Sequence, residues 1–420
     1  MPMPAASDRE ILAALFDAAL SAALPDGRFA GRLPEPPRGR TIVLGAGKGA
    51  ARMAAAFEKA WAEAGNGPLE GLVVTRYGHG MATQSIEVVE ASHPVPDAAG
   101  MQAAERILDL ARAAGPEDLV VFLMSGGASA LLALPAPGLT LADKQALNRA
   151  LLKSGAPIGA MNRVRKAASA IKGGRLAAAA APARHVTYLI SDVPGDDPGA
   201  IGSGPTIPDE SDPEAALAIL AEYGIAIEPR VAEAIRANRV AAPAPGRVEM
   251  LATPKMALDA AAAKARELGL SPLVLGDSIE GEAREVARVL AAIAQYAADH
   301  GEPVARPAVI LSGGETTVTV RGKGRGGRNA EFLLALAIAL GGRAGIAALA
   351  CDTDGIDGSE DNAGAWFDDR ILDAARAAGI DPAAHLANND GYGFFAALDR
   401  LIVTGPTLTN VNDFRAILIC

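Results

Sequence analysis

The sequence is poor in aromatic residues and in long apolar runs, and each shortage excludes a class of protein. Aromatic side chains make up 4% of the 420 residues, and the formal net charge is −10. The chain therefore lacks both the stacking surfaces and the overall positive field that nucleic-acid binding needs. Its longest strongly apolar run, residues 332–340, is about half as long as the roughly 20 residues of a membrane-spanning helix. We expect neither a nucleic-acid partner nor a membrane span.

Cysteine is also scarce. Cys351 and Cys420 are too few for a metal cluster and too far apart in sequence to read as a redox pair. The first residues, MPMPAASDRE, lack the charged segment and apolar core of a secretory signal. A cytoplasmic protein with reduced thiols is the simplest interpretation.

Short apolar runs that lead into glycine-rich turns and then into helical patterns organise the chain. They lie at residues 41–44, 119–124, 188–190 and 308–311. This alternation is typical of an α/β protein with a parallel sheet. The Ala/Pro/Gly-rich stretch 236–248 separates two groups of these units. We therefore predict two α/β domains, residues 1–240 and residues 241–420.

Ligands of such sheets bind outside the carboxyl ends of the strands, so the loops there are candidate sites. The loop GAGKG, residues 45–49, combines Gly45, Gly47 and Gly49 with Lys48. Its glycines allow backbone N–H groups to approach an anion at a helix N-terminus. The loop matches neither a Walker A motif nor the full dinucleotide fingerprint. A tight turn with a solvated lysine is an equally good interpretation.

The segment RGKGRGGRNAE, residues 321–331, is the strongest basic feature. It lies between an expected strand, 316–320, and an expected helix, 330–340, and its cations are Arg321, Lys323, Arg325 and Arg328. Glycines let the backbone fold closely around phosphate oxygens while arginine neutralises their charge, which suits a polyphosphate. A solvated turn is the alternative.

Aspartates gather in two further loops. CDTDGIDG, residues 351–358, carries Asp352, Asp354 and Asp357, without the spacing of an EF-hand. Hard oxygen ligands at a strand end suit Mg²⁺, although an Asp/Gly turn explains the same spacing. The loop after residues 188–190 carries three more aspartates, of which one could accept a proton from a substrate hydroxyl: Asp192, Asp196 and Asp197.

A helix expected over residues 160–172 places Arg165, Ser169 and Lys172 on one face. Such a face can hold a carboxylate or a phosphate, or it can simply be solvated. The five histidines are dispersed, so we assign no zinc. Anion loops, cations and carboxylates together are the equipment of phosphoryl transfer.

At these same loops the sequence resembles the glycerate 2-kinase family, whose carboxyl-terminal part is known as the MOFRL domain. The resemblance covers nearly the whole chain and rests on short motifs that are specific in this order and spacing: GAGKGAARM (45–53), SHPVPD (92–97), MSGGASALL (124–132), IKGGRLA (171–177), ISDVPGDDP (190–198), GSGPT (202–206), LGDSIEGEAREVA (275–287), LSGGETTVTV (311–320), GRGGRN (324–329), DTDGIDG (352–358) and TGPTLTNVND (404–413). One departure is Ala330, where a polar residue, often Gln, is expected; this puts a side-chain contact in doubt but not the loop.

The resemblance implies two Rossmann-like α/β/α domains with mainly parallel sheets and an active-site cleft between them. It also implies ATP-dependent phosphorylation of D-glycerate at its 2-hydroxyl, giving 2-phospho-D-glycerate and ADP, with Mg²⁺. A homo-oligomer is compatible with it. By motif, the catalytic residues are Lys48, Asp192 and Arg328. Asp192 would orient or deprotonate the hydroxyl, and the two cations would stabilise charge on the phosphoryl group and the glycerate carboxylate.

The same resemblance assigns the remaining site residues. Asp352 and Asp354 are the candidates for Mg²⁺. The residues expected to line substrate or nucleotide subsites are Gly45, Gly47, Ser125, Gly126, Gly127, Ser129, Lys172, Ser312, Gly313, Gly314, Glu315, Arg325, Asn329 and Asn410.

Two other functions compete with the kinase. Hydroxypyruvate reductase is a label that similar proteins have carried, but it needs a nicotinamide site with an acid that binds the ribose about 20 residues after the glycine loop. Here Glu63 falls inside an expected helix, and Glu70 precedes the next strand rather than ending it. A regulator that binds sugar phosphates is the non-enzymatic alternative.

Overall fold

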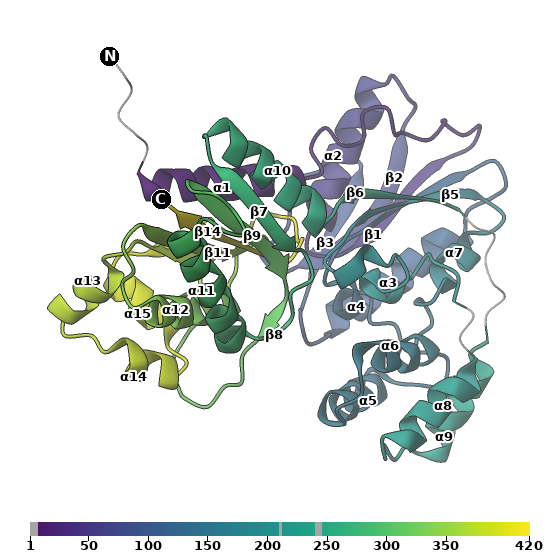
Figure 1. Ribbon diagram of the computed structural model, residues 1–420. Helices are drawn as coiled ribbons and strands as arrows, with labels where there is room; N and C mark the ends of the chain where they lie inside the picture. Colours follow the sequence, from purple (N-terminus) through teal and green to yellow (C-terminus); the bar gives the residue numbers. More distant parts are fainter. Residues whose placement is uncertain (1–6, 210–211, 240–245) are drawn as a thin grey trace. The chain divides into compact units, whose positions relative to one another are not determined.

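The computed structural model describes residues 7–209, 212–239 and 246–420. The chain forms two compact units (Figure 1). Pro25–Leu251 makes the first, which we call the parallel-sheet unit. The second, which we call the mixed-sheet unit, joins the segment up to Leu24 with Ala252–Cys420. The two-domain α/β architecture is confirmed.

The parallel-sheet unit is built on six parallel strands in the order β3-β2-β1-β4-β5-β6. This is the doubly wound order, in which the chain reverses its winding direction between β1 and β4. Both strands are buried along their whole length, as expected of central parallel strands covered on two faces. The strands are β1 (Thr41–Ala46), β2 (Leu69–Arg76), β3 (Ile86–Ala91), β4 (Leu119–Met124), β5 (Arg184–Ile190) and β6 (Arg247–Ala252).

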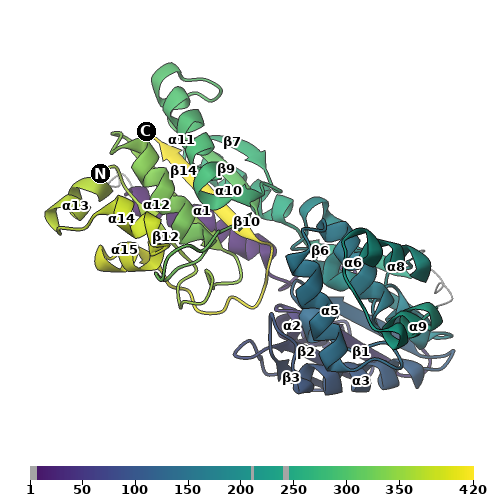
Figure 2. The same ribbon diagram turned by 90° about the horizontal axis from the view of Figure 1, so that it is seen from below.

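Helices in this unit fall into two groups. Those that flank the sheet are α2 (Ala50–Glu63), α3 (Ala98–Arg112), α4 (Ala128–Leu131) and α7 (Arg175–Ala180). A second group has a small apolar core of its own and is gathered together in Figure 2: α5 (Leu141–Lys153), α6 (Ile158–Ala167), α8 (Pro213–Glu222) and α9 (Pro229–Ala237). The loop after β5 contains two short 3₁₀ turns, η1 (Pro194–Asp196) and η2 (Ile201–Ser203).

The mixed-sheet unit also has a six-stranded sheet, in the order β13-β12-β11-β14-β9-β7. Only β7 and β9 pair in parallel, while the other neighbours are antiparallel. The expectation of mainly parallel sheets therefore holds for the first unit, and this second sheet is mixed. The last strand of the chain inserts between β9 and β11 and runs opposite to both. The strands are β7 (Ser271–Gly276), β9 (Ala308–Gly314), β11 (Ile346–Asp352), β12 (Gly364–Phe367), β13 (Leu401–Ile402) and β14 (Asp413–Ile419).

Helices cover both faces of this sheet (Figure 1). On one side α1 (Asp8–Ala23) packs against α10 (Pro254–Glu267), and on the other α11 (Ala283–His300) packs against α12 (Arg328–Leu340). Helix α1 begins with a capping box, in which Ser7 and Glu10 satisfy each other's backbone amides. The remaining elements are β8 (Gly281–Glu282), β10 (Thr316–Thr317), α13 (Ile371–Ala377), α14 (Pro382–Ala387) and α15 (Gly391–Ala397).

The division of the chain differs from the predicted boundary at both ends. The segment 240–245, where we place that boundary, lies outside the described residues. Beyond it, β6 still belongs to the first sheet, so the chain changes unit at Leu251 and Ala252. At the other end, α1 belongs with the carboxyl-terminal half because its apolar face, with Leu12, Leu15 and Phe16, is buried in the mixed-sheet unit.

None of the helices in the described part of the chain combines the length and the apolar character that a membrane-crossing helix needs.

Candidate active site

Three of the predicted loops leave the parallel sheet side by side. Ala46, the last residue of β1, pairs with Met124, the last residue of β4, and Met124 pairs with Leu189 near the end of β5. The loop after β4, SGGAS (residues 125–129), therefore lies between the loop that carries Lys48 and the loop that carries Asp192. At the usual strand spacing, these two outer loops begin about 10 Å apart. They lie at the point where the winding reverses, which is where doubly wound sheets bind ligands.

The GAGKG loop is braced against the SGGAS loop. The amide of Lys48 donates to the carbonyl of Gly126 at 2.8 Å, and the amide of Gly49 donates to Ser125 Oγ at 3.0 Å. A Cβ at Gly47, where φ is +132°, would lie 2.2 Å from the same Oγ. These amides therefore have partners within the protein, and Gly47 is required by close packing. The backbone of this loop is thus hydrogen-bonded within the protein, and its role in anion binding stays a prediction.

Lys48 lies against the left-handed turn at Gly127. A Cβ on Gly127 would come within 3.2 Å of both Lys48 Cγ and His93 Nε2, and φ is +81°. Gly45 is equally confined, because its Cβ would lie 2.4 Å from the carbonyl of Leu123. The glycines of these two loops thus bring Lys48 and His93 to the carboxyl edge of the sheet.

Ser129 connects this edge to a buried lysine. Ser129 Oγ lies 2.7 Å from Ser203 Oγ, and the carbonyl of Ser129 accepts from Lys172 Nζ at 2.7 Å. Lys172 is 1% exposed. Burial, together with the positive charges of Lys144 and Arg165, holds the pKa of Lys172 well below its ordinary value.

The helix expected over residues 160–172 is shorter in the structure. It ends at Ala167, and Ser169 forms an isolated bridge to Pro135 while its Oγ donates to the carbonyl of Leu134 at 3.0 Å. The alternative of a solvated helix face is therefore wrong for Lys172, because its side chain is buried within the parallel-sheet unit.

Asp192 stands out among the three aspartates of its loop. It follows β5 almost directly and is half-buried at the edge of the sheet. Asp197, further along, is exposed and accepts from the amide of Gly199 at 2.9 Å, as a turn-forming aspartate does. Position therefore favours Asp192 as the group that faces a substrate.

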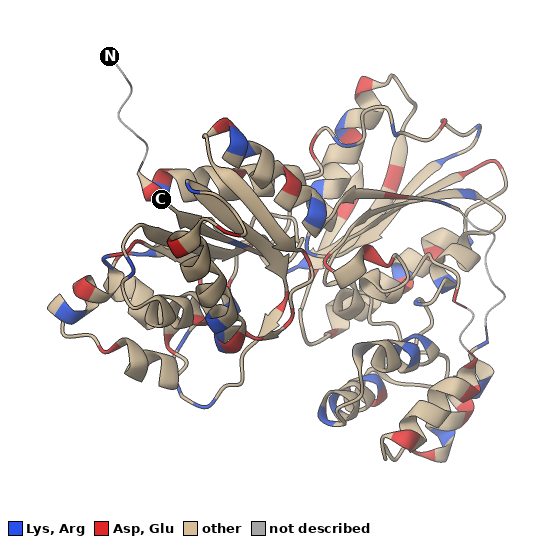
Figure 3. Cartoon of the chain, in the orientation of Figure 1, with Lys and Arg blue, Asp and Glu red and all other residues tan. Residues whose placement is uncertain are grey.

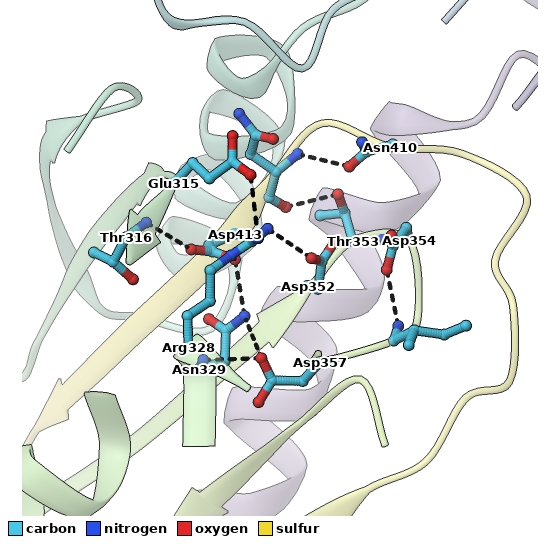
Figure 4. Close-up of polar contacts among 12 residues, drawn as sticks. Glu315, Thr316, Arg328, Asn329, Asp352, Thr353, Asp354, Asp357, Asn410 and Asp413 are labelled. Carbon is cyan, nitrogen blue, oxygen red and sulfur yellow. Dashed lines mark hydrogen bonds and ion pairs between the residues drawn. The ribbon is translucent and has the colours of Figure 1, made fainter. Parts of the chain in front are cut away.

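Arg328 is the centre of a carboxylate cluster in the mixed-sheet unit (Figure 4). It is the first residue of α12, and its side chain is 24% exposed. Its Nε lies 2.7 Å from Asp413 Oδ1, its Nη2 lies 2.7 Å from Asp352 Oδ2 and its Nη1 lies 3.2 Å from Glu315 Oε1. Burial opposes its charge, but these carboxylates outweigh that effect and hold the pKa of Arg328 above its ordinary value.

Asp413, which the sequence did not single out, joins most of this cluster. Its Oδ1 also accepts from Asn329 Nδ2 at 2.8 Å, and its Oδ2 accepts from Arg415 at 2.6 Å. Arg415 is 1% exposed and also contacts the carbonyl of Gly313. The sequence feature that could have identified Asp413 is the charged pair that it forms with Arg415 in an otherwise apolar strand.

Asp357 closes the amino end of α12. Its two carboxylate oxygens accept from the amides of Asn329 and Ala330, each at 2.9 Å. Burial raises the pKa of Asp357 to about 6, although these two hydrogen bonds act in the opposite direction. Ala330 is fully buried and takes part through its backbone, so the loop keeps its conformation despite the departure at this residue.

Asp352 and Asp354 already bond locally. Asp352 Oδ1 accepts from the amide of Asp354 at 3.0 Å, and Asp354 Oδ1 accepts from the amide of Ile356 at 2.8 Å. Within the described part of the chain, no group of three or more His, Cys, Asp or Glu side chains has the geometry of a metal site. Two carboxylates completed by phosphate oxygens and water remain a donor set that suits Mg²⁺.

The basic loop, residues 321–331, is docked through its backbone. The amides of Arg321 and Gly322 donate to Asn389 Oδ1 at 2.7 and 3.0 Å, and the amide of Arg325 donates to Asp390 at 3.1 Å. The guanidinium of Arg325 lies 4.7 Å over the ring of Tyr392. The amides that we expected to surround phosphate are thus used by the protein, and what the loop presents outward is its exposed cationic side chains.

The second SGG motif differs from the first. Ser312, Gly313 and Gly314 belong to β9 and pair with β14, whereas the first motif turns into α4. The glycine-rich turn that we expected directly after residues 308–311 is therefore part of the strand. Glu315 follows at the strand end beside Arg328, and Asn410 is buried with its Oδ1 accepting from the amide of Asn412 at 3.2 Å.

Comparison with known proteins places these features in a family. Residues 11–236 match a family described as a domain of unknown function, DUF4147, and residues 308–413 match the MOFRL family. A protein of Agrobacterium vitis named "Putative hydroxypyruvate reductase" is 55% identical, covering 98% of this chain and 95% of its own. The D-glycerate 2-kinase of Thermotoga maritima is 40% identical over 94% of each chain.

A solved structure agrees with the sequence comparison. The crystal structure of a glycerate kinase from Thermotoga maritima superposes with a TM-score of 0.89 at 38% identity, covering 98% of this chain and 99% of that one. Sequence and fold agree over almost the whole length. The chain belongs to the glycerate kinase family, with its DUF4147 and MOFRL parts.

Proposed function

We propose that this protein is a glycerate 2-kinase, which transfers the γ-phosphoryl group of ATP to the 2-hydroxyl of D-glycerate and releases 2-phospho-D-glycerate and ADP. The observation that carries the proposal is the placement of Lys48 and Asp192 on the two loops that flank the SGGAS loop, at the carboxyl edge of the parallel sheet where its winding reverses. A cation and a carboxylate at one ligand-binding edge are what phosphoryl transfer to an alcohol requires. The 40% identity to a D-glycerate 2-kinase supports it.

Each of these two side chains has one task in the proposed reaction. Asp192 accepts a hydrogen bond from the 2-hydroxyl and takes its proton as the new P–O bond forms. Lys48 contacts the oxygens of the phosphoryl group and stabilises the charge that they carry during transfer. Ser125 and Gly126 hold Lys48 in place through the bracing hydrogen bonds of its loop, and Gly127 packs against its side chain.

Arg328 contributes to the site from the mixed-sheet unit in this proposal. Of its three carboxylate partners, Glu315 is half exposed, whereas Asp352 and Asp413 are 5% and 0% exposed. An incoming carboxylate or phosphate can therefore take the place of Glu315 and leave the two buried ion pairs intact. Arg325, Asn329, Asn410 and residues 312–314 are the other residues of the mixed-sheet unit that we propose for ligand binding.

Mg²⁺, when bound, neutralises charge on the phosphate oxygens and orients them. Asp352 and Asp354 are the residues that would hold it. The donor set fits a hard cation because it contains only oxygen atoms, and because the carboxylates around Arg328 and Arg415 outnumber these two guanidinium groups.

Hydroxypyruvate reductase is the second candidate, because the 55% identical relative from Agrobacterium vitis carries that name. The fold can be compared with one requirement of a reductase, the acid that binds the ribose of the nicotinamide cofactor. In dinucleotide-binding sheets an acid at the carboxyl end of β2 binds the ribose. Here β2 ends in Thr75 and Arg76, and Glu70 lies at its opposite end, paired with Ile42 of β1. The kinase is therefore the better-supported activity.

One pair of assays separates the two. Purified protein is incubated with D-glycerate, ATP and Mg²⁺, and enolase is added to detect 2-phosphoglycerate directly, with L-glycerate as the control. In parallel, hydroxypyruvate is offered with NADH or with NADPH. We expect ADP and 2-phosphoglycerate in the first assay only. Oxidation of a nicotinamide cofactor without formation of ADP would overturn the proposal.

A further inference from the structure

A cavity of about 440 Å³ lies inside the parallel-sheet unit beside the SGGAS loop. Gly127 and Ser129 form part of its wall, so it adjoins the turn against which Lys48 packs. Its volume is in the range of ligand pockets. The rest of the wall comes from α5, from α6 and from the loop after β3, and Figure 3 shows basic residues on both helices.

The charges around this cavity all have one sign. The charged side chains that line it are Lys144, Arg149, Arg165 and Lys172, and no aspartate or glutamate among the described residues is part of the wall. Like charges gathered around a partly enclosed space repel one another and lose hydration. Such an arrangement is stable when a ligand supplies the opposite charge.

Lys144 makes the imbalance most evident. Its stem is partly exposed, but its Nζ is buried and has no hydrogen-bond partner. Burial, with the nearby charges of Arg165 and Arg175, lowers the pKa of Lys144 to about 7. A buried ammonium without a partner is costly to keep, so its presence in the wall points to a bound anion.

The other cations are bonded only to neutral groups. Arg165 donates from Nε to the amide oxygen of Asn148 at 2.8 Å and from Nη1 to that of Asn162 at 3.3 Å. Lys172 donates to a backbone carbonyl. Neither has a carboxylate partner among the residues that the structure describes. Neither side chain is therefore neutralised by an acidic group of the described protein.

The remainder of the wall is apolar, with Val95, Pro96, Leu147, Leu151 and Leu152. A three-carbon acid has no surface to place against these side chains and fills only a fraction of the volume. A nucleotide has both a polyanionic and an apolar part. Several cations on one side and an aliphatic wall on the other match these two parts.

We propose that this cavity binds the nucleoside triphosphate, with its phosphates against Lys144, Arg165 and Lys172 and its base against the aliphatic wall. The inference deepens the proposed function and rests on it for the identity of the donor. The terminal phosphate would then lie toward Gly127 and Lys48, at the edge where Asp192 also lies. The nucleotide would thus be held by the parallel-sheet unit.

The test is Lys144→Met, which keeps the aliphatic stem and removes the ammonium. Binding of ATP, inorganic triphosphate and adenosine to the full-length protein is measured by calorimetry without glycerate. We expect ATP and triphosphate to bind about 10- to 100-fold more weakly, as for loss of a charge-assisted hydrogen bond, and adenosine to bind unchanged. Lys153→Met is the matched control, because Lys153 is exposed on the same helix and outside the cavity wall.

Folding and substrate binding are checked separately. The melting temperature of Lys144→Met should equal or exceed that of the parent, since the variant removes a buried unpartnered charge, and the KM for glycerate should change less than twofold. Unchanged ATP affinity in a folded variant would overturn the inference, as would a raised KM for glycerate with unchanged ATP affinity. A parent protein that binds ATP through Lys144 but does not phosphorylate glycerate would leave this inference standing and remove the proposed function.

Discussion

The two units of this protein treat buried positive charge in opposite ways. In the parallel-sheet unit, Lys144, Arg165 and Lys172 surround a cavity and bond to neutral groups or to none. In the mixed-sheet unit, Arg328 has three carboxylate partners. The first arrangement is incomplete without an anion, whereas the second is already neutralised by the protein. We therefore expect the cations of the parallel-sheet unit to serve binding, and Arg328 to stabilise its own unit in addition to its proposed role in binding.

From this difference we expect mutations of basic residues to affect activity and folding differently in the two units. Removal of a cation from the parallel-sheet unit should weaken binding or catalysis and leave folding intact. Removal of Arg328 should damage the fold as well, since buried carboxylates lose their counter-charge.

The largest effect on activity is expected for Asp192→Asn. The amide cannot take the proton of the hydroxyl, so kcat should fall by about 10²- to 10⁴-fold, the usual contribution of a general base, while the melting temperature is kept. Asp197→Asn, in the exposed part of the same loop, is the control and should retain activity. An unimpaired kcat in Asp192→Asn would remove this residue from the chemistry.

Arg328→Ala should produce the largest loss of stability. Asp352 would remain buried without its guanidinium partner, and Asp413 would keep only Arg415. Breaking these buried ion pairs costs about 3–5 kcal/mol in the free energy of unfolding. Chemical denaturation measures it. Arg325→Ala provides the control, because Arg325 is exposed in the same loop and its loss should cost less than about 1 kcal/mol. Equal costs for the two variants would contradict the contrast between the units.

Lys48→Ala should separate activity from stability. Loss of one group that stabilises the transition state typically lowers kcat by about 10²-fold or more. The free energy of unfolding should change by less than about 1 kcal/mol, since the loop is held by backbone bonds to Ser125 and Gly126. Lys59→Ala on the exposed face of α2 serves as the matched control. If kcat and the free energy of unfolding of Lys48→Ala fell together, the role of Lys48 would be structural.

A pH dependence of stability, with no change in the chemistry, is expected in the parallel-sheet unit. Burial lowers the pKa of Lys144 from 10.5 to about 7 in the folded chain. Between these values the unfolded chain binds a proton that the folded chain does not, so the free energy of unfolding rises with pH. In Lys144→Met this contribution is absent. The stability advantage of the variant should therefore shrink between about pH 7 and pH 10 in thermal melts, and a constant difference would contradict the low pKa.

Loop positions were predictable from the sequence, because the carboxyl ends of parallel strands share one edge. This rule alone brings Lys48 and Asp192 together, and the structure places their loops there. Strand direction in the second sheet was not predictable. A buried strand such as Ile346–Asp352 is apolar throughout, and its composition is the same whether its neighbours run parallel or antiparallel.

The glycines were predicted for the wrong reason. A glycine that approaches a phosphate and a glycine that approaches another loop look identical in sequence, and only the packing at Gly47 and Gly322 distinguishes them. Lys144 was missed altogether. Within LADKQALN it reads as an ordinary helix-surface lysine, and its burial depends on α6 and on the loop after β3, which are distant in the chain.

The position of α1 has a consequence for synthesis. This helix precedes the parallel-sheet unit in the chain, yet Phe16 packs against Phe414 at 5.8 Å between ring centroids, and the carbonyl of Ala23 accepts from Thr409 at 2.7 Å. Its partners follow that unit in the chain and leave the ribosome after it. Because domains fold as units during synthesis, the parallel-sheet unit can be complete while the apolar face of α1 still waits for the carboxyl-terminal strand. The second unit is thus the last to fold, although it contains the first helix.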